Sequence, residues 1–377
     1  MGENYGTQYQ GLNEHGLPHD TGNVPATEAT REDIIEAISS ESTKLVLNTF
    51  LGTWLEQMGE NSRLAGPDRK PVSDYRLPME RDKETVIILG PGASQSLYTE
   101  HYPAMRENAT IVTSPTALYW AKKNGLDPDI VVTADSSKSQ PILLEAAENT
   151  APVFAGTHCY PTLNNQREVY WYTPLMGNGK ARPEENEFNW WDIPVMYWNK
   201  DLDWNYPSVG CVVNMEVQIV QDLRARGIIG GRRIVLLGVD FGPWRNYRRV
   251  PANPEMSDFP TIDGPQGFLE WDGALTDLTG ISYKFTLLRL WIEHLTPIYT
   301  MSHGIAHEFP RIEPSNIINN DFPVYPGRAE IAEKCEAYFE KYAYEYPRVA
   351  VEYTEATDKA GGRQSDFVPP RSKWGKA

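Results

Sequence analysis

Two glycines and a serine directly follow one of the strongly apolar runs of this sequence. Residues 86–89, Val-Ile-Ile-Leu, lead into residues 90–94, Gly-Pro-Gly-Ala-Ser. Gly90 and Gly92 can adopt backbone angles that other residues avoid and can let a ligand approach the main chain, while Ser94 can cap a following helix. The N–H groups at that helix start would face an anion. The pattern predicts a turn that binds a phosphate or a nucleotide, and an ordinary strand–helix turn is the alternative.

This turn differs from the fingerprint of dinucleotide-binding proteins. Gln95 stands where that fingerprint needs its third glycine, and the next apolar run, 109–113, ends at Ser114 without a carboxylate for a ribose. Nicotinamide and flavin cofactors are therefore disfavoured, while Ser114 is a candidate for binding another kind of nucleotide. The sequence also lacks a Gly-x-Ser-x-Gly nucleophile elbow, a Walker phosphate loop and the protein-kinase motifs, which argues against a serine hydrolase and a P-loop NTPase.

Aspartates follow two further apolar runs. Asp135, with Ser136 beside it as a candidate ligand-binding residue, comes after residues 129–133, and Asp240 comes after residues 233–238. Asp135 could position a metal, bind a ribose hydroxyl or act as a base, and its alternative role is to cap the next helix. Asp240 would orient the loop after its strand, and it is the second candidate catalytic acid. The two carboxylates leave room for one metal ion, but neither has an acid as its neighbour, so magnesium is not favoured.

Three histidines are candidate general bases because each follows a predicted strand: His158, His303 and His307. His158 is preferred since it comes almost directly after the apolar run 153–155, although a lone histidine usually has a structural role. Lys284 could hold a phosphate, and a surface position is the alternative expected for it.

The acidic composition argues against some classes of binding partner. The chain has 377 residues and a formal net charge of −16, which argues against broad binding to nucleic acid or to an anionic membrane. Its three cysteines have no metal-ligand spacing and are odd in number, and no apolar stretch approaches the roughly 18 residues needed to span a bilayer. We expect a cytoplasmic protein whose ligands are small molecules.

Short apolar runs alternate with helical patterns along the middle of the chain. Strands are predicted at 86–89, 109–113, 129–133, 152–155, 233–238 and 297–301, and helices at 94–106, 115–124, 137–148, about 210 to 226, and 281–294. This alternation predicts an α/β fold with a Rossmann-like, doubly wound, mostly parallel sheet. The region between residues 155 and 208 is expected to be irregular.

The predicted sheet defines three parts of the chain. Residues 84–310 would form the Rossmann-type domain. Residues 1–83 would form an N-terminal arm, an amphipathic helix at about 30–58 and a linker, and residues 311–377 a helix at 328–343 and a charged tail. The arm, residues 1–28, and the tail are candidate contacts for a protein partner.

Ligands of open parallel sheets bind outside the carboxyl ends of the strands, near the point where the strand order reverses. We therefore expect three features to converge there: the turn 90–94, the strand end 131–137 and the turn 207–210. Ser208 and Gly210 in the last turn are further candidates for binding the ligand.

Four blocks of this sequence occur in a defined order: residues 86–94, 114–135, 208–210 and 233–241. In content and order they resemble the MptE-like Rossmann superfamily. That superfamily includes archaeal hydroxymethylpterin pyrophosphokinases and the motility-accessory-factor (Maf) flagellin glycosyltransferases, and bacterial sialyltransferases have a related fold. The first block matches the family's Gly-x-Gly-Pro-Ser turn with the proline displaced, and the last matches its strand ending Gly-x-Asp. The resemblance covers residues 84 to about 310.

The resemblance implies a transferase that uses a nucleotide donor, with Gly90, Gly92 and Ser94 near the donor phosphates and Asp135 and Asp240 beside the pocket. The archaeal pyrophosphokinases have a double-Asp strand end and a His-Gly-Asp-Asn motif, whereas this chain has Asp-Ser at 135–136 and Gly-Thr-His-Cys at 156–159. Both departures favour the sialyltransferase-like members, which need no metal and can use a histidine as base.

The leading hypothesis is therefore a transferase that moves a sugar from a nucleotide-sugar donor to the hydroxyl of an unidentified acceptor. The first alternative is a pterin-type pyrophosphokinase that uses ATP and magnesium. The second is a catalytically inactive binding or assembly module that contacts protein partners through residues 1–28 and the C-terminal tail.

Overall fold

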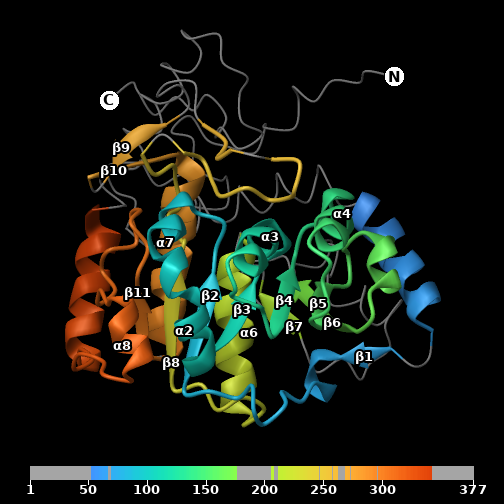
Figure 1. The fold of residues 1–377 in the computed structure, drawn as a ribbon, viewed down its shortest axis with the longest axis horizontal. Helices are drawn as coiled ribbons and strands as arrows, with labels where there is room; N and C mark the ends of the chain where they lie inside the picture. The colour runs from blue at the N-terminus through green and yellow to red at the C-terminus, as the bar shows by residue number, and fades with distance from the viewer. Residues whose placement is uncertain are drawn as a thin grey trace, which may run out of the picture.

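A computed structural model of the chain describes residues 52–66, 69–175, 205–207 and 211–341, apart from positions 246, 257, 262–267, 272 and 295. Within these residues, nine strands form one parallel sheet in the order β1-β6-β5-β4-β3-β2-β8-β11, with β7 paired to β6 (Figure 1). Its strands are β1 (Lys70–Pro71), β2 (Thr85–Leu89), β3 (Ala109–Thr113), β4 (Ile130–Thr133), β5 (Val153–Gly156), β6 (Val169–Leu175), β7 (Asn205–Pro207), β8 (Arg233–Leu237) and β11 (Ile298–Thr300). A separate antiparallel pair is formed by β9 (Leu269–Trp271) and β10 (Ala274–Thr276).

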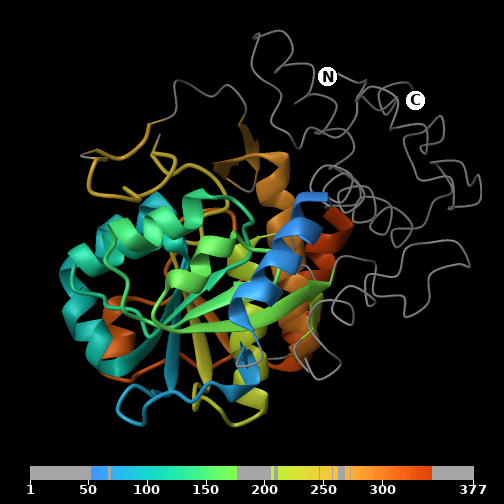
Figure 2. The same ribbon diagram turned by 90° about the vertical axis from the view of Figure 1, so that its right-hand side faces the viewer.

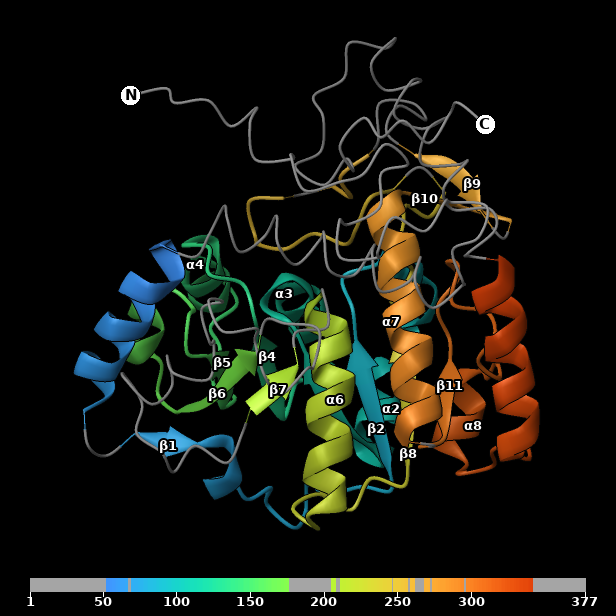
Figure 3. The ribbon, with the colours of Figure 1, turned by 180° about the vertical axis from the view of Figure 1, so that it is seen from behind.

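Helices cover both faces of this sheet because its central strands are apolar on both sides. In β2, Val86 and Ile88 belong to one core while Ile87 and Leu89 belong to the core on the other side. The face seen in Figure 3 is covered by α6 (Val212–Ala225) and α7 (Leu278–His294). The opposite face is covered by α2 (Tyr102–Asn108), α3 (Pro115–Lys123), α4 (Ser139–Ala146) and α8 (Pro314–Ile318). The predicted α/β, doubly wound architecture is confirmed.

The strand order reverses at β2, and this reversal positions the candidate site. From β2 the chain adds β3, β4, β5 and β6 in one direction, then returns to place β8 on the other side of β2, followed by β11. The pairing of β2 with β8 runs from Thr85 opposite Arg233 to Leu89 opposite Leu237. The turns that follow β2 and β8 therefore leave the same edge of the sheet side by side.

The sheet is longer at one edge than the sequence predicts. The region expected to be irregular contains β6 and β7, and the expected linker contains β1, which pairs with β6. The N-terminal helix described here spans residues 52–65, past its predicted end at 58, and lies against the edge of the sheet (Figure 2). Asn61 of this helix donates hydrogen bonds to the carbonyls of Thr157 (3.0 Å) and Cys159 (2.7 Å) just after β5.

One predicted helix is two elements in the structure. Residues 94–106 were expected to form a single helix, but the 3-10 helix η4 (Ala93–His101) precedes α2 there. Pro103 occupies the first turn of α2, and a proline lacks an N–H group and clashes with the preceding turn of a continuous helix. The helix at the end of the described chain covers residues 328–341, close to its prediction. None of the described helices combines the length and the apolar character needed to cross a membrane.

Candidate functional site

The glycine turn after β2 is closed onto the end of β8. The Gly90 N–H donates to the carbonyl of Leu237 (2.9 Å), and the Gly92 N–H donates to the carbonyl of Gly238 (2.7 Å). A Cβ atom on Gly92 would lie 2.4 Å from Oδ2 of Asp240 and 2.5 Å from the Gly238 oxygen. The missing side chain at position 92 is therefore required by the contact with β8, and the N–H groups of both glycines are used within the protein.

Asp240 ties three backbone segments together. Its carboxylate, 2% exposed, accepts hydrogen bonds from the Ser94 N–H (3.0 Å), the Ser94 hydroxyl (2.5 Å) and the His303 N–H (3.2 Å). Burial raises the pKa of the Asp240 carboxyl, and the hydrogen bonds from Ser94 and His303 oppose that rise. The carboxylate thus holds the turn after β2 and the loop after β11 against the end of β8, as expected for a residue that orients its loop.

His303 lies at this junction and is a half-buried, neutral imidazole. The Tyr98 hydroxyl is 3.0 Å from its Nε2, and Nη2 of Arg311 is 2.5 Å from the same atom. Burial, Arg311 and Arg245 together lower the pKa of His303 to about 4. Because an arginine only donates, Nε2 carries the lone pair and the single proton of the neutral ring is on Nδ1. The ring of Trp244 lies 5.9 Å from the imidazole, between centroids.

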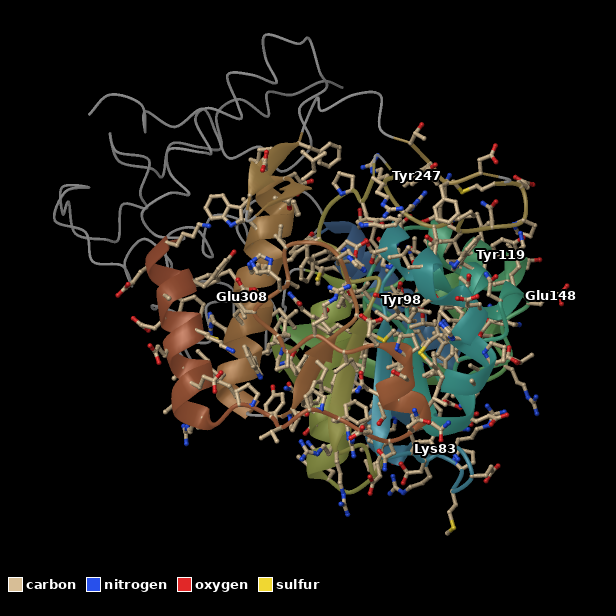
Figure 4. All side chains as sticks on the ribbon, turned by 60° about the vertical axis from the view of Figure 1, so that its left-hand side comes forward. Lys83, Tyr98, Tyr119, Glu148, Tyr247 and Glu308 are labelled. Carbon is tan, nitrogen blue, oxygen red and sulfur yellow. The ribbon has the colours of Figure 1, made fainter. Side chains whose placement is uncertain are left out.

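The segment that follows β8 is anchored over this junction. The Val250 N–H donates to the carbonyl of Pro91 in the glycine turn (3.0 Å). Further along, Phe259 packs edge-on against Trp120 of α3, with 5.0 Å between ring centroids. Figure 4 shows Tyr247 of this segment, which packs on Phe259 (5.4 Å), at the upper end of the molecule. Segment 241–261 therefore contacts both the glycine turn and the neighbouring helix.

Asp135 stabilises the turn that leads into α4, although the N-cap of that helix is Lys138. Its exposed carboxylate accepts hydrogen bonds from the Ser137 N–H (2.8 Å) and from the Gln140 side chain (2.8 Å) at the start of α4. The carbonyl of the neighbouring Ser136 accepts a hydrogen bond from Gln57 (3.2 Å). Because β3 separates β4 from β2, both residues are two strands from the glycine turn. No three His, Cys, Asp or Glu side chains among the described residues are grouped so that they could hold a metal ion.

His158 is packed in the interior, three strands from β2. It is 2% exposed, its Nε2 is 2.8 Å from the carbonyl of Ala134, and its ring meets Trp54 edge-on at 4.8 Å. Since a carbonyl only accepts, Nε2 carries the proton, and Nδ1 has no hydrogen-bond partner among the described residues. Burial lowers the pKa of His158 to about 4. This geometry is that of a structural histidine.

Four candidate residues remain: Ser114, Ser208, Gly210 and Lys284. Ser114 is buried directly after β3, next to the glycine turn, and its hydroxyl has no partner among the described residues. Ser208 and Gly210 lie outside the described residues. Lys284 was expected at the surface, but its side chain is 0% exposed. Its Nζ lies 2.5 Å from Glu308 and 4.2 Å from the centre of the Tyr338 ring.

Sequence reasoning missed Tyr98 and Arg311, which contact His303 directly. Tyr98 lies on η4, the short helix that also contains Ser94. Its closeness to Ser94 in the sequence was the only signal that could have indicated it. Arg311 reaches the site because its backbone forms a parallel bridge with Thr300 at the end of β11. That contact is made by the main chain and has no residue pattern of its own.

The comparison with solved structures supports this architecture. The chain is similar in fold to the MAf glycosyltransferase from Magnetospirillum magneticum AMB-1, with a TM-score of 0.50 and 16% sequence identity over 85% of this chain and 49% of the other. The chain therefore spans about half the length of that protein. No protein-family model and no curated protein matches the sequence. The Maf-related part of the resemblance is thus confirmed at the level of the fold.

Proposed function

We propose that this protein transfers a sugar from a nucleotide-sugar donor to an acceptor hydroxyl, at the carboxyl ends of β2, β8 and β11. The observation that carries the proposal is the neutral, half-buried imidazole of His303 at the reversal of the strand order, where ligands of such sheets bind. A general base must be proton-free at the working pH and within reach of the acceptor. His303 meets the first condition through its low pKa, and its place beside the glycine turn favours the second.

In this proposal His303 is the base, in place of His158. His158 is enclosed by Trp54 and the carbonyl of Ala134, whereas His303 is only partly covered. Asp240 is the residue that positions His303, because its carboxylate accepts the backbone N–H of that residue. Gly90, Gly92 and Ser94 shape the turn beside which the donor phosphate lies, and Ser114 offers it a hydroxyl.

Two further findings support a sugar-nucleotide as the donor. The solved structure of similar fold is that of a MAf glycosyltransferase. In addition, Arg311 and Arg245 both act electrostatically on His303, and their positive charges favour a phosphate at this junction in a chain of net charge −16. The acceptor contributes a hydroxyl group.

The experiment is a thermal-shift screen of the purified chain against CMP, UDP, GDP, ATP and nucleotide-sugars, each with magnesium and with chelator, followed by a donor-hydrolysis or transfer assay with the stabilising donor. Selective stabilisation by a nucleotide-sugar is expected. Stabilisation by ATP with magnesium alone would instead indicate the pyrophosphokinase, and no response to any nucleotide would indicate a binding or assembly module.

His303→Gln and His307→Gln form a matched pair for the transfer assay. Both histidines follow β11, but the side chain of His307 is exposed and lies 3.8 Å from Glu308. We expect His303→Gln to lower the transfer rate by at least about 100-fold, the usual contribution of a general base, and His307→Gln to leave it unchanged. Equal rates for wild type and His303→Gln would refute the role of His303.

A further inference from the structure

The guanidinium of Arg311 donates its hydrogen bonds to uncharged acceptors. Nη1 donates to the carbonyl of Ser302 (2.8 Å), and Nη2 donates to the Tyr98 hydroxyl (3.2 Å) and to Nε2 of His303 (2.5 Å). The side chain belongs to an exposed residue, so its guanidinium is open to solvent as well. A guanidinium forms its strongest hydrogen bonds with phosphate and carboxylate oxygens, and it binds a phosphate with two parallel N–H groups. An anion that reaches this junction would therefore compete with His303 for Arg311.

The contact between Arg311 and His303 also blocks the base. Two donors, the Tyr98 hydroxyl and the Arg311 N–H, converge on the one lone pair of Nε2. These two donors come from different elements: Tyr98 lies on η4, and Arg311 lies in the segment after β11. Other charged groups in the described part of the chain lie near this cluster: Arg245, stacked on Trp244 at 4.4 Å, the Asp240 carboxylate, which holds the backbone of His303, and Glu313, whose charge acts on Tyr98.

We propose that Arg311 couples the leaving group to the base: the donor phosphate draws the guanidinium away from Nε2 of His303, the Tyr98 hydroxyl turns its proton away from the same atom, and the freed lone pair then accepts the proton of the acceptor hydroxyl. This inference rests on the proposed function, since it names the phosphate of the nucleotide donor as the anion. Without the anion, the two arginines and burial hold the pKa of His303 near 4, so the imidazole is a weak base. With Arg311 on the phosphate, one of those charges is neutralised.

The coupled step balances in atoms and charge. The acceptor oxygen forms a bond to the anomeric carbon of the sugar while the bond from that carbon to the phosphate oxygen breaks. The bonding electron pair leaves with the nucleoside phosphate, whose new negative charge is stabilised by Arg311. The hydroxyl proton moves to Nε2 and produces an imidazolium, which returns the proton to water after the products leave. The same side chain thus releases the base and stabilises the leaving group.

The test is NMR of the imidazole nitrogens in the 377-residue chain with isotope-labelled histidines, and inorganic pyrophosphate is the anion. The chain has seven histidines, and His303→Gln identifies the relevant signal. Without pyrophosphate, His303 is expected as the Nδ1–H tautomer with a pKa near 4. With saturating pyrophosphate, its pKa is expected to move toward the ordinary value of about 6.5. A signal that does not move at saturation, or a wild type that does not bind pyrophosphate, would overturn the inference.

Variants separate this coupling from a general charge effect. Arg311→Gln should raise the pKa of His303 in the absence of pyrophosphate and abolish the response to it, while Arg311→Lys, which keeps a charge, should retain part of the response. Arg328→Gln removes one exposed arginine at the start of the helix 328–341 and should behave as the wild type. A response in Arg311→Gln equal to that of the wild type would contradict the role of Arg311.

The transfer assay distinguishes failure of this inference from failure of the proposed function. We expect Arg311→Gln to lower the transfer rate roughly 100-fold, since it loses the group that stabilises the leaving phosphate. Transfer by Arg311→Gln at the wild-type rate would overturn the inference and leave the proposed function intact. A pyrophosphate response in a protein that transfers from no nucleotide-sugar would overturn the proposed function and leave the anion-dependent release of His303 standing.

Discussion

Replacing Gly92 with alanine tests whether the turn after β2 is fixed by its contact with β8. Gly92 has φ −59° and ψ 142°, angles that alanine adopts without strain, so any cost must come from atoms that meet the new methyl group. Those atoms are Oδ2 of Asp240, at 2.4 Å, and the backbone oxygen of Gly238, at 2.5 Å. The Gly238 oxygen already accepts the N–H of residue 92, so it has little freedom to move away.

The expected cost follows from two effects. Forcing a methyl group into a packed contact costs about 1–3 kcal/mol. Moving the Asp240 carboxylate away from Ser94 weakens a charge-assisted hydrogen bond, which is worth about 1.5–3 kcal/mol. The free energy of unfolding should therefore fall by roughly 2.5–6 kcal/mol, and the melting temperature by at least about 5 °C.

Thermal and denaturant unfolding of Gly92→Ala measure this cost, with Gly327→Ala as the control. A Cβ on Gly327 meets no atom within 4 Å, so that variant should melt at or slightly above the wild-type temperature. The double variant Gly92→Ala/Asp240→Ala should lose less stability than the two single variants together, because the carboxylate that clashes is gone. A Gly92→Ala protein with wild-type stability and impaired nucleotide binding would refute this reasoning and show that the turn is an open phosphate site.

Three more predictions follow from buried polar groups. Asp240→Asn places an amide NH2 against a donor from Ser94 or His303, and we expect about 2–3 kcal/mol less stability in denaturant unfolding; an unchanged midpoint would contradict its anchoring role. Lys284→Met removes the nearest cation from the mostly buried Glu308, which keeps only the longer contact with His307 among the ion pairs of the described residues, and should cost about 3 kcal/mol. Adding Glu308→Gln should recover part of that loss, and strictly additive costs would argue against the pair. For His158, the pKa is about 4 in the folded state and 6.5 in the unfolded state, so between these values the unfolded chain binds more protons. Stability is then full above about pH 6.5 and falls by up to about 3 kcal/mol as the pH drops to 4. His158→Gln should flatten this slope in pH-dependent unfolding, and an identical slope in both proteins would contradict the assignment.

The strands that sequence reasoning located are almost wholly buried. All residues of β2, β3, β4 and β5 are buried, and an apolar run with glycine or proline at its ends is enough to indicate such a strand. β6 was missed because its sequence, Val-Tyr-Trp-Tyr-Thr-Pro-Leu, mixes aromatic rings with polar groups. Its edge position, where it pairs with two-residue β1 and three-residue β7, depends on chain segments far away in the sequence.

The sequence could predict the backbone turns of the candidate site, whereas it could not predict which side chains gather around His303. The turn 90–94 and Asp240 follow strands, and the rule that ligands bind where the strand order reverses brings them together. The preference for His158 over His303 was made without the strand order: both histidines follow strands, but only β11 lies beside β8. Knowing the order β2-β8-β11 would have favoured His303. No local pattern marks Arg311, whose contact with His303 is purely tertiary.

The site combines a fixed backbone with an exposed charged side chain, and the two parts have different consequences for the proposed chemistry. Asp240 holds the main chain of His303 and the turn at Ser94, so it determines where the imidazole stands. Arg311 donates to the ring nitrogen, the Tyr98 hydroxyl and a carbonyl, so in the proposed mechanism it determines whether the imidazole can accept a proton. In the proposed mechanism, the position of His303 and its ability to accept a proton are thus controlled by different residues. A ligand anion can change the second without disturbing the first, because the carboxylate that anchors the loop is buried and Arg311 is exposed.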